Sequence, residues 1–320
     1  MKGLTDIPGI RVGHASDYEA LTGCTVIVCE GGAVAGADIR GSASGTQEFH
    51  VMDPGHVAPR VHAVVLAGGS AFGLEAASGV RRYLEQKGVG FETGAARVPI
   101  VPCAILYDLG IGKAGVRPTR EMGEAAAAAA TAEAVAEGAV GAGTGATVGK
   151  IFGMSQAMKG GIGSATVSLE GKYAGVHVAS LAAVNAVGDV RDPATGKIIA
   201  GARRSPASRE FADTALLVKR GVRMGFPGQN TTLVVVATNA RLSKVEARKL
   251  AELAQLGVAR TIAPVNTMSD GDLVVALSLG DRQADIDALG VAAAEAVSES
   301  ILRAVRLAPT LGGVPGLAGK

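Results

Sequence analysis

Aromatic side chains are scarce in this sequence of 320 residues, which contains no tryptophan and only 3% aromatic residues. Proteins that hold single-stranded nucleic acid stack its bases on aromatic side chains, so this mode of binding is not expected. The formal net charge is +2, and no basic stripe is present to attract DNA or an anionic membrane. We therefore expect neither nucleic acid nor a membrane as a partner.

Long apolar runs are also lacking. No stretch of about 20 uncharged apolar residues suggests a membrane helix, and residues 1–10 show no secretory signal, so a cytoplasmic location is the expectation. The three cysteines cannot all pair and are expected to be buried thiols; they are Cys24, Cys29 and Cys103. Histidines recur every six residues between His50 and His62 without a compact zinc spacing, so we expect no metal or cofactor.

What the chain does contain is a set of apolar runs that alternate with helical patterns. Runs rich in β-branched residues predict strands at 24–30, 61–67, 231–238 and 273–280, and a further strand within 98–109. Helical spacing of apolar residues predicts helices at 71–86, 121–137, 209–220, 243–258 and 286–301. Ser243 and Glu246 form a capping-box pattern at the start of the fourth of these helices.

The strands at 231–238 and 273–280 are apolar almost throughout, which indicates a sheet covered on both faces. This favours an α/β or α+β fold with sheets between helix layers. No interdomain linker is visible, so we expect a single domain over 1–320. If these two strands are parallel neighbours joined by the helix at 243–258, their amino-terminal ends lie together.

The sharpest chemical feature is the segment GQNTTL at 228–233, in which a turn-forming sequence meets two hydroxyl residues at the start of a buried strand. If the bond between Asn230 and Thr231 breaks, Thr231 gains a free α-amine with an ordinary pKa of about 7.7–8.0. Such an amine can act as the base for the hydroxyl of its own residue. The alternatives are paired threonines placed for β-propensity alone and an Asn-Thr-Thr glycosylation sequon.

The same hydroxyl would make the cut. Thr231 would attack the carbonyl of Asn230 by an N-to-O acyl shift, and water would then release chains of residues 1–230 and 231–320.

Seven segments spread over almost the whole chain are similar to one known family. They are LTDIPGIRVGHA at 4–15, HAVVLAGGSAFGLEAA at 62–77, VPIVPCAILYDL at 98–109, GAGTGATVGK at 141–150, KGGIGSA at 159–165, AVNAVGDV at 183–190 and NTTLVVVATNA at 230–240. The chain resembles the self-processing family of L-aminopeptidase/D-esterases, β-peptidyl aminopeptidases and nylon-oligomer (6-aminohexanoate oligomer) endohydrolases. GAGTGATVGK itself fails as a P-loop, because Thr144 and Ile151 stand where a glycine and a hydroxyl residue are required.

The resemblance implies a four-layer α/β/β/α fold of the N-terminal-nucleophile hydrolase type, cleavage before an internal Ser or Thr, and an oligomer, often a tetramer. Thr231 with the acidic pair Asp270 and Asp272 looks most similar to the nylon-oligomer branch. The implied substrates are small amides: short peptides or ω-amino-acid oligomers.

The resemblance also assigns partners to Thr231. Lys159 is expected to contact the nucleophile and Asn185 to donate to the oxyanion, the alternatives being a solvated lysine and a turn-forming asparagine. Asp270 and Asp272 would hold the amine or Lys159, or bind a cationic substrate end, the alternative being a solvated acidic turn. Tyr107 is a candidate oxyanion or substrate contact, although a tyrosine in a strand is usually packing.

Three functions follow as hypotheses. The first is an amidase that passes an acyl group to Thr231 and then to water. The second is an acyltransferase of the ornithine acetyltransferase type, which also splits before a threonine. The third is a non-catalytic binding protein on the same scaffold.

Overall fold

The architecture rests on a nine-stranded sheet that folds over at one long strand, β2 (Thr22–Ile39). The computed structural model describes residues 2–223 and 230–319. The strand order is β10-β11-β14-β16-β2-β4-β7-β3, with β1 paired to β2 outside this path. An irregularity between Val28 and Ala33 divides β2, so that its first half pairs with β1 and β4 and its second half with β16.

The other strands of this sheet are β1 (Arg11–Asp17), β3 (Gly45–Gln47), β4 (Val61–Ala67), β7 (Cys103–Ile105), β10 (Gly161–Ser168), β11 (His177–Asn185), β14 (Thr231–Ala240) and β16 (Leu273–Arg282). Three smaller sheets use β5 (Phe91–Glu92), β6 (Arg97–Val98), β8 (Thr147–Val148), β9 (Met158–Lys159), β12 (Asp189–Arg191), β13 (Ile198–Ala200) and β15 (Ile262–Ala263). The α-helices are α1 (Ala76–Gln86), α2 (Arg120–Ala128), α3 (Thr214–Lys219), α4 (Lys244–Thr261) and α5 (Ile286–Arg306).

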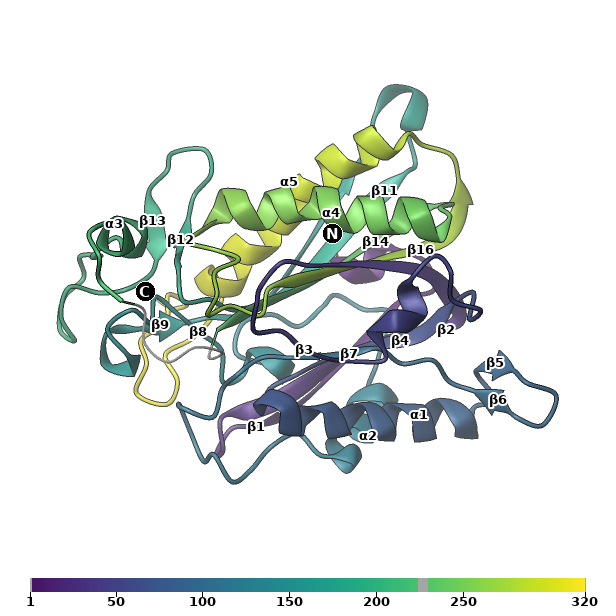
Figure 1. Ribbon diagram of the computed structural model, residues 1–320, viewed down its shortest axis with the longest axis horizontal. Coiled ribbons are helices and arrows are strands. Elements are labelled where there is room, and N and C mark those ends of the chain that lie inside the picture. The colour runs from purple at the N-terminus through teal and green to yellow at the C-terminus, as the bar shows by residue number, and fades with distance from the viewer. Residues whose placement is uncertain (1, 224–229, 320) are drawn as a thin grey trace.

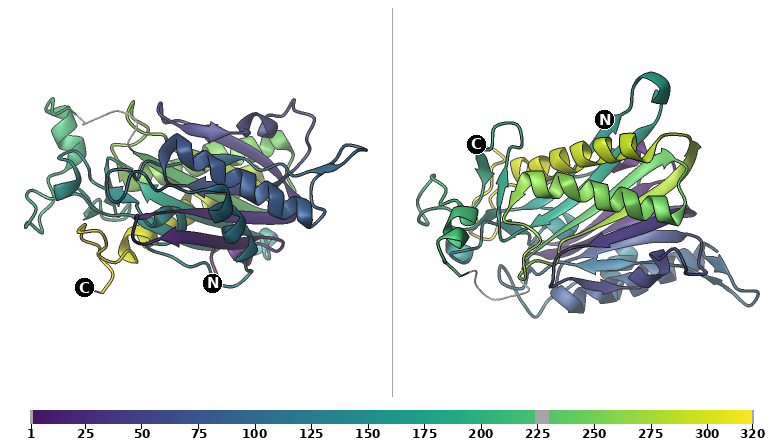
Figure 2. Two further views of the ribbon diagram at one scale, coloured as in Figure 1. Left: turned by 90° about the horizontal axis from the view of Figure 1, so that it is seen from below. Right: turned by 45° about the horizontal axis from the view of Figure 1, so that its top comes forward.

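Helices cover both outer faces of the folded sheet. The long helices α4 and α5 pack on the half that contains β10, β11 and β16, whereas α1 and α2 pack on the half that contains β1 and β4 (Figures 1 and 2). The two halves face each other, which gives four layers in the order α/β/β/α and confirms the expected fold. None of the described helices is long and apolar enough to cross a membrane.

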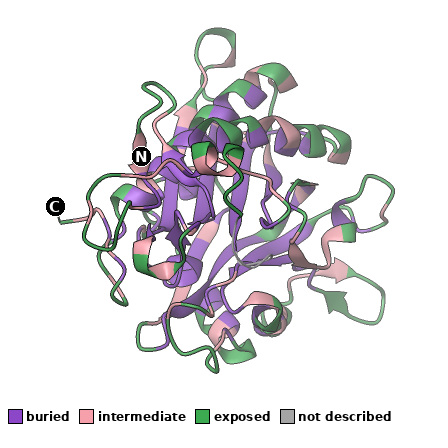
Figure 3. Ribbon diagram, turned by 60° about the vertical axis from the view of Figure 1, so that its left-hand side comes forward, coloured by how far each residue is buried: buried purple, intermediate pink, exposed green. Residues whose placement is uncertain are grey.

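Three apolar cores separate the four layers, and β14 shows why the sequence supports them. Leu233, Val235 and Ala237 point into the core between the two halves of the sheet. Val234 and Val236 point into the core beneath α4 and α5, because successive strand side chains alternate between faces. Both cores exclude water, so an uninterrupted apolar run is what this strand requires (Figure 3).

Most predicted elements are present. The strands at 24–30, 61–67, 231–238 and 273–280 lie within β2, β4, β14 and β16. The capping box at Ser243 and Glu246 starts α4, and β14 and β16 are parallel neighbours joined by that helix. The three cysteines are free and buried.

Three of the predicted helices have a wrong boundary. The helix predicted over 121–137 ends at Ala128, because the backbone of Thr131 exchanges two hydrogen bonds with Val12 of β1. The helix predicted over 209–220 begins at Thr214, where the Asp213 carboxylate accepts from the N–H of Leu216. The helix predicted over 71–86 is α-helical only from Ala76, after a 3-10 helix over Ser70–Glu75. The further strand expected within 98–109 is present as β7.

The buried face of β14 gives a stability prediction. Replacing the fully buried Leu233 by alanine removes packing from the core between the two half-sheets, and we expect a loss of about 2–5 kcal/mol in the free energy of unfolding. Leu256→Ala, at a position on α4 that is 43% exposed, is the matched control and should stay within about 0.5 kcal/mol. Urea denaturation of both variants measures the difference; equal losses would contradict this assignment of the core.

Candidate active site

The site forms where the amino-terminal ends of β14 and β16 lie side by side. Leu233 is opposite Leu273 in the parallel register, and three residues before them Asn230 bridges to Asp270. The acidic pair is therefore close to Thr231 in space, although about 40 residues separate them in sequence. This confirms the expected neighbourhood of the two strand ends.

Thr231 is the first residue of β14 and is 2% exposed. Its Oγ1 donates to the carbonyl oxygen of Asn230 over 2.5 Å. The same carbonyl oxygen accepts from the backbone N–H of Gly271 over 2.8 Å. The hydroxyl of the predicted nucleophile thus lies directly beside the carbonyl group that self-cleavage would attack.

The two carboxylates are engaged with backbone rather than with solvent. Asp272 accepts from the N–H of Thr232 over 2.6 Å and from the N–H of Asn266 over 2.9 Å. Asp270 accepts from the hydroxyl and the N–H of Thr267, over 2.6 and 3.1 Å. Asp272 therefore fastens the residue that follows Thr231, and the alternative of a solvated acidic turn was wrong, since both side chains are almost fully buried.

Asn185 ends β11, is fully buried, and is paired with Thr231 across the antiparallel ladder. Its Oδ1 accepts from the Lys150 ammonium over 2.9 Å and from the N–H of Thr147 over 3.0 Å. Its Nδ2 donates to the backbone oxygen of Tyr107 over 3.0 Å. The amide plane is therefore fixed from both ends, with its donor side toward the segment of Tyr107.

Lys159 is buried at the end of β9, in the two-stranded sheet that β9 forms with β8. In the described residues its Nζ donates to the backbone oxygens of Thr144 and Ala146, over 2.8 and 2.7 Å. The direct contact with Thr231 that the resemblance implies is not among the hydrogen bonds of these residues. The Lys159 side chain is instead held by these two backbone carbonyl groups.

Burial dominates the ionisation of this site. It lowers the pKa of Lys159 to about 7, against the opposing attraction of Asp108. It also lowers the pKa of Lys150 to about 7, although the nearby Asp270 acts in the opposite direction. Burial raises the pKa of Asp272, and the charge of Asp270 raises it further. The neutral form of each group is favoured because a charge has lost its water.

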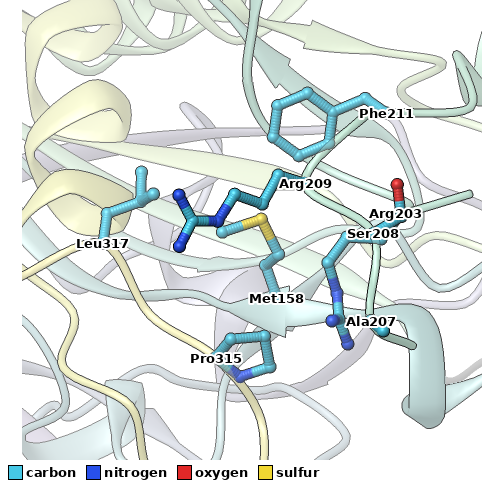
Figure 4. A pocket seen from close by; sticks show the side chains of 8 residues that line it. All are labelled: Met158, Arg203, Ala207, Ser208, Arg209, Phe211, Pro315 and Leu317. Atoms are coloured by element: carbon cyan, nitrogen blue, oxygen red, sulfur yellow. The ribbon is translucent and has the colours of Figure 1, made fainter. Parts of the chain in front are cut away.

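Two cavities have lining residues from the site or from β9, which carries Lys159. The smaller, about 40 Å³, is lined by Tyr107, Asp108, Gly110, Ile111, Gly145, Thr147, Lys150 and Met154. The larger, about 640 Å³, is lined by Met158, Arg203, Ala207, Ser208, Arg209, Phe211, Pro315 and Leu317. Figure 4 shows the guanidinium group of Arg209 between Met158 and Leu317, with the ring of Phe211 nearby. Met158, which lines the larger cavity, directly precedes Lys159 in β9.

Two residues of the site, Lys150 and Gly271, were not predicted from the sequence. Lys150 ends GAGTGATVGK, a segment that carries the family resemblance and fails as a P-loop, but its bonds to Asn185 span 35 positions and no local pattern predicts them. Gly271 stands between the two predicted aspartates, and its backbone N–H has no signature in a sequence. Among the described residues no group of three His, Cys, Asp or Glu is arranged to hold a metal ion.

Comparison with known proteins fits this geometry. The sequence profile of peptidase family S58 matches residues 2–318. The chain belongs to this peptidase family. It is 38% identical to an uncharacterized aminopeptidase of Mycobacterium leprae over 348 residues, which cover 100% of this chain and 94% of the relative. It is 30% identical to the 6-aminohexanoate-oligomer endohydrolase of Kocuria sp. over 326 residues, 94% of this chain and 85% of the relative.

Solved structures of peptidase relatives share the fold. A β-aminopeptidase of Burkholderia sp. aligns with a TM-score of 0.69 and 25% identity, over 99% of this chain and 91% of its own. The L-aminopeptidase D-Ala-esterase/amidase of Ochrobactrum anthropi, described as a variant of the Ntn hydrolase fold, aligns with a TM-score of 0.73 and 20% identity, over 98% and 88%. The chain thus shares the Ntn hydrolase fold, and as a member of peptidase family S58 it is a hydrolase of peptide or amide bonds.

The buried lysines predict a pH dependence of stability. Lys150 and Lys159 have folded-state pKa values of about 7 against an ordinary 10.5. Between these values the unfolded chain holds protons that the folded chain has released, so the free energy of unfolding should rise with pH from about 7 toward 10.5. Lys159→Met should reduce this slope, because methionine does not titrate. Lys249→Met, on the exposed face of α4, is the control. Denaturation between pH 7.5 and 9.5 measures both, and an unchanged slope in Lys159→Met would contradict the assignment.

Proposed function

We propose that the protein cuts its own chain between Asn230 and Thr231 and then uses Thr231 as an N-terminal nucleophile. Its substrates would be short peptides or ω-amino-acid oligomers, and its products the acid and the amine of the hydrolysed amide. The mature protein would consist of chains 1–230 and 231–320, which assemble as an oligomer.

One observation carries this proposal: the Thr231 hydroxyl is buried 2.5 Å from the carbonyl oxygen of Asn230. A threonine placed at a strand start for β-propensity alone needs no bond to the preceding carbonyl. The β-branched side chain restricts rotation about χ1, so the oxygen loses little entropy when it is held there.

After the cut, the freed α-amine of Thr231 would take the proton of its own hydroxyl. Asn185 lies opposite Thr231, and its amide would donate to the oxyanion as the substrate carbonyl becomes tetrahedral. Asp272 would hold the strand end through Thr232.

Lys150 and Lys159 would supply positive charge to the site. Because burial brings their pKa values to about 7, each side chain can release a proton as an ammonium or take one up as an amine near neutral pH. Lys150 would also keep the Asn185 amide in one orientation through their 2.9 Å bond.

Replacement of the nucleophile tests the proposal. Thr231→Ala should remain a single chain and lose amide hydrolysis by at least about 10³-fold, whereas Thr231→Ser should still cut because it keeps a hydroxyl. Thr232→Ala is the matched control, since the neighbouring hydroxyl accepts and donates no hydrogen bond among the described residues, and it should cut at the normal rate. Intact mass measures the cut. A Thr231→Ala protein that still divides, or that stays fully active, would exclude this mechanism.

We further infer that the 640 Å³ cavity receives the carboxylate-bearing end of a chain-like substrate. Its walls are apolar at Met158, Phe211 and Leu317. Arg209 projects among them (Figure 4), and among the described residues it forms no ion pair that would neutralise it. A guanidinium between apolar walls suits a carboxylate at the end of an apolar chain.

A pair of substrates tests this inference. Arg209→Gln should raise the KM for a linear 6-aminohexanoate oligomer about tenfold, as expected for one lost charge-assisted hydrogen bond. The same oligomer with an amidated carboxyl end should be unaffected. Arg204→Gln is the control, because Arg204 lies on the same loop but pairs with Glu210. Equal KM changes for the two oligomers would contradict this use of the cavity. Acyl transfer to an added amino acid that exceeds hydrolysis would instead identify an acyltransferase.

A further inference from the structure

Among residues 2–223 and 230–319, the carbonyl oxygen of Asn230 has two donors, and only one of them belongs to the predicted nucleophile. The other is the backbone N–H of Gly271, 2.8 Å away. When a hydroxyl attacks a carbonyl carbon, the negative charge gathers on the carbonyl oxygen. The Gly271 N–H therefore points at the atom that would become negative during self-cleavage.

The turn that carries this N–H is fastened on several sides. Asp272 binds the N–H groups of Thr232 and Asn266 through its side chain. The backbone oxygen of Asp270 accepts from the N–H of Ala43 over 2.8 Å. The segment 270–272 thus grips the strand end both before and after Thr231. A donor held in this way needs no rearrangement when charge develops, which is the condition for strong oxyanion stabilisation.

A glycine is required at this point by space. A Cβ atom on residue 271 would lie 2.8 Å from Oγ1 of Thr231, 2.9 Å from the backbone oxygen of Ala43 and 3.0 Å from Cα of Ser44. Two of these three atoms are backbone and cannot swing away. Only glycine lets the turn approach the hydroxyl and the carbonyl this closely.

We propose that the backbone N–H of Gly271 is the oxyanion donor of the self-cleavage step. This rests on the proposed function, because it assigns a role within the cut at Thr231. Oγ1 of Thr231 forms a bond to the carbonyl carbon of Asn230, which closes a five-membered ring and places the negative charge on the oxygen that Gly271 binds. The C–N bond then breaks, the hydroxyl proton passes to the Thr231 nitrogen, and water hydrolyses the resulting ester to the Asn230 carboxylate.

The direct test removes this N–H while every side chain of the site stays unchanged; it also weakens the Asp270 carbonyl as the acceptor for Ala43. Cell-free translation with a transfer RNA that carries glycolic acid replaces the amide of Gly271 by an ester, which keeps the shape but has no hydrogen to donate. We expect the cut to slow by about 10²–10³-fold, the effect of deleting one oxyanion donor. Glycolic acid at Gly196 is the control, because that N–H donates to Asp192 in a remote turn. Intact mass over time gives both rates.

The outcomes separate this inference from the function on which it rests. If the unmodified chain never cuts, the proposed function fails. If the unmodified chain cuts and the ester at Gly271 cuts equally fast, the oxyanion role alone is overturned.

A second measurement does not depend on the folding of the ester. In the uncut Thr231→Ala chain, the Gly271 N–H should be strongly protected from hydrogen exchange, because it is bonded to a buried carbonyl. Exchange as fast as that of the Gly196 N–H would overturn the assignment.

Discussion

The site depends on the parallel pairing of β14 with β16. Because Leu233 is opposite Leu273, the turn before β16 must lie against the residues before and after the first residue of β14. Two bonds then hold that strand end: Asp272 accepts from the N–H of Thr232, and Gly271 donates to the carbonyl of Asn230. Neither bond forms if the register slips, since a shift of one residue would also turn the apolar side chains of both strands away from their cores.

Burial of this strand end has an electrostatic consequence. Two lysines and three aspartates lie in or beside a site from which water is largely excluded, and they are Lys150, Lys159, Asp108, Asp270 and Asp272. Such groups are tolerated because each is hydrogen-bonded and because the charges are mixed. The arrangement brings two ammonium groups to pKa values of about 7, the range in which a proton can move in either direction at neutral pH.

Local sequence signals predicted the scaffold well and the site only in part. The apolar runs of β14 and β16 and the capping box at Ser243 were sufficient to place the two strands and α4. The helix predicted over 121–137 ends at Ala128 because the backbone of Thr131 is hydrogen-bonded to Val12 of β1. This tertiary pairing outweighs the helix propensity of alanine. Lys150 and Gly271 act through contacts between distant segments, and no local pattern encodes these. The role assigned to Lys159 remains a prediction.

The central claim is that Thr231 becomes the first residue of a new chain, with an amine of its own. N-terminal sequencing of purified, active protein tests this most directly. We expect two N-terminal sequences, one from the original start of the chain and one that reads Thr-Thr-Leu-Val-Val. Fully active protein that yields only the original start would contradict it.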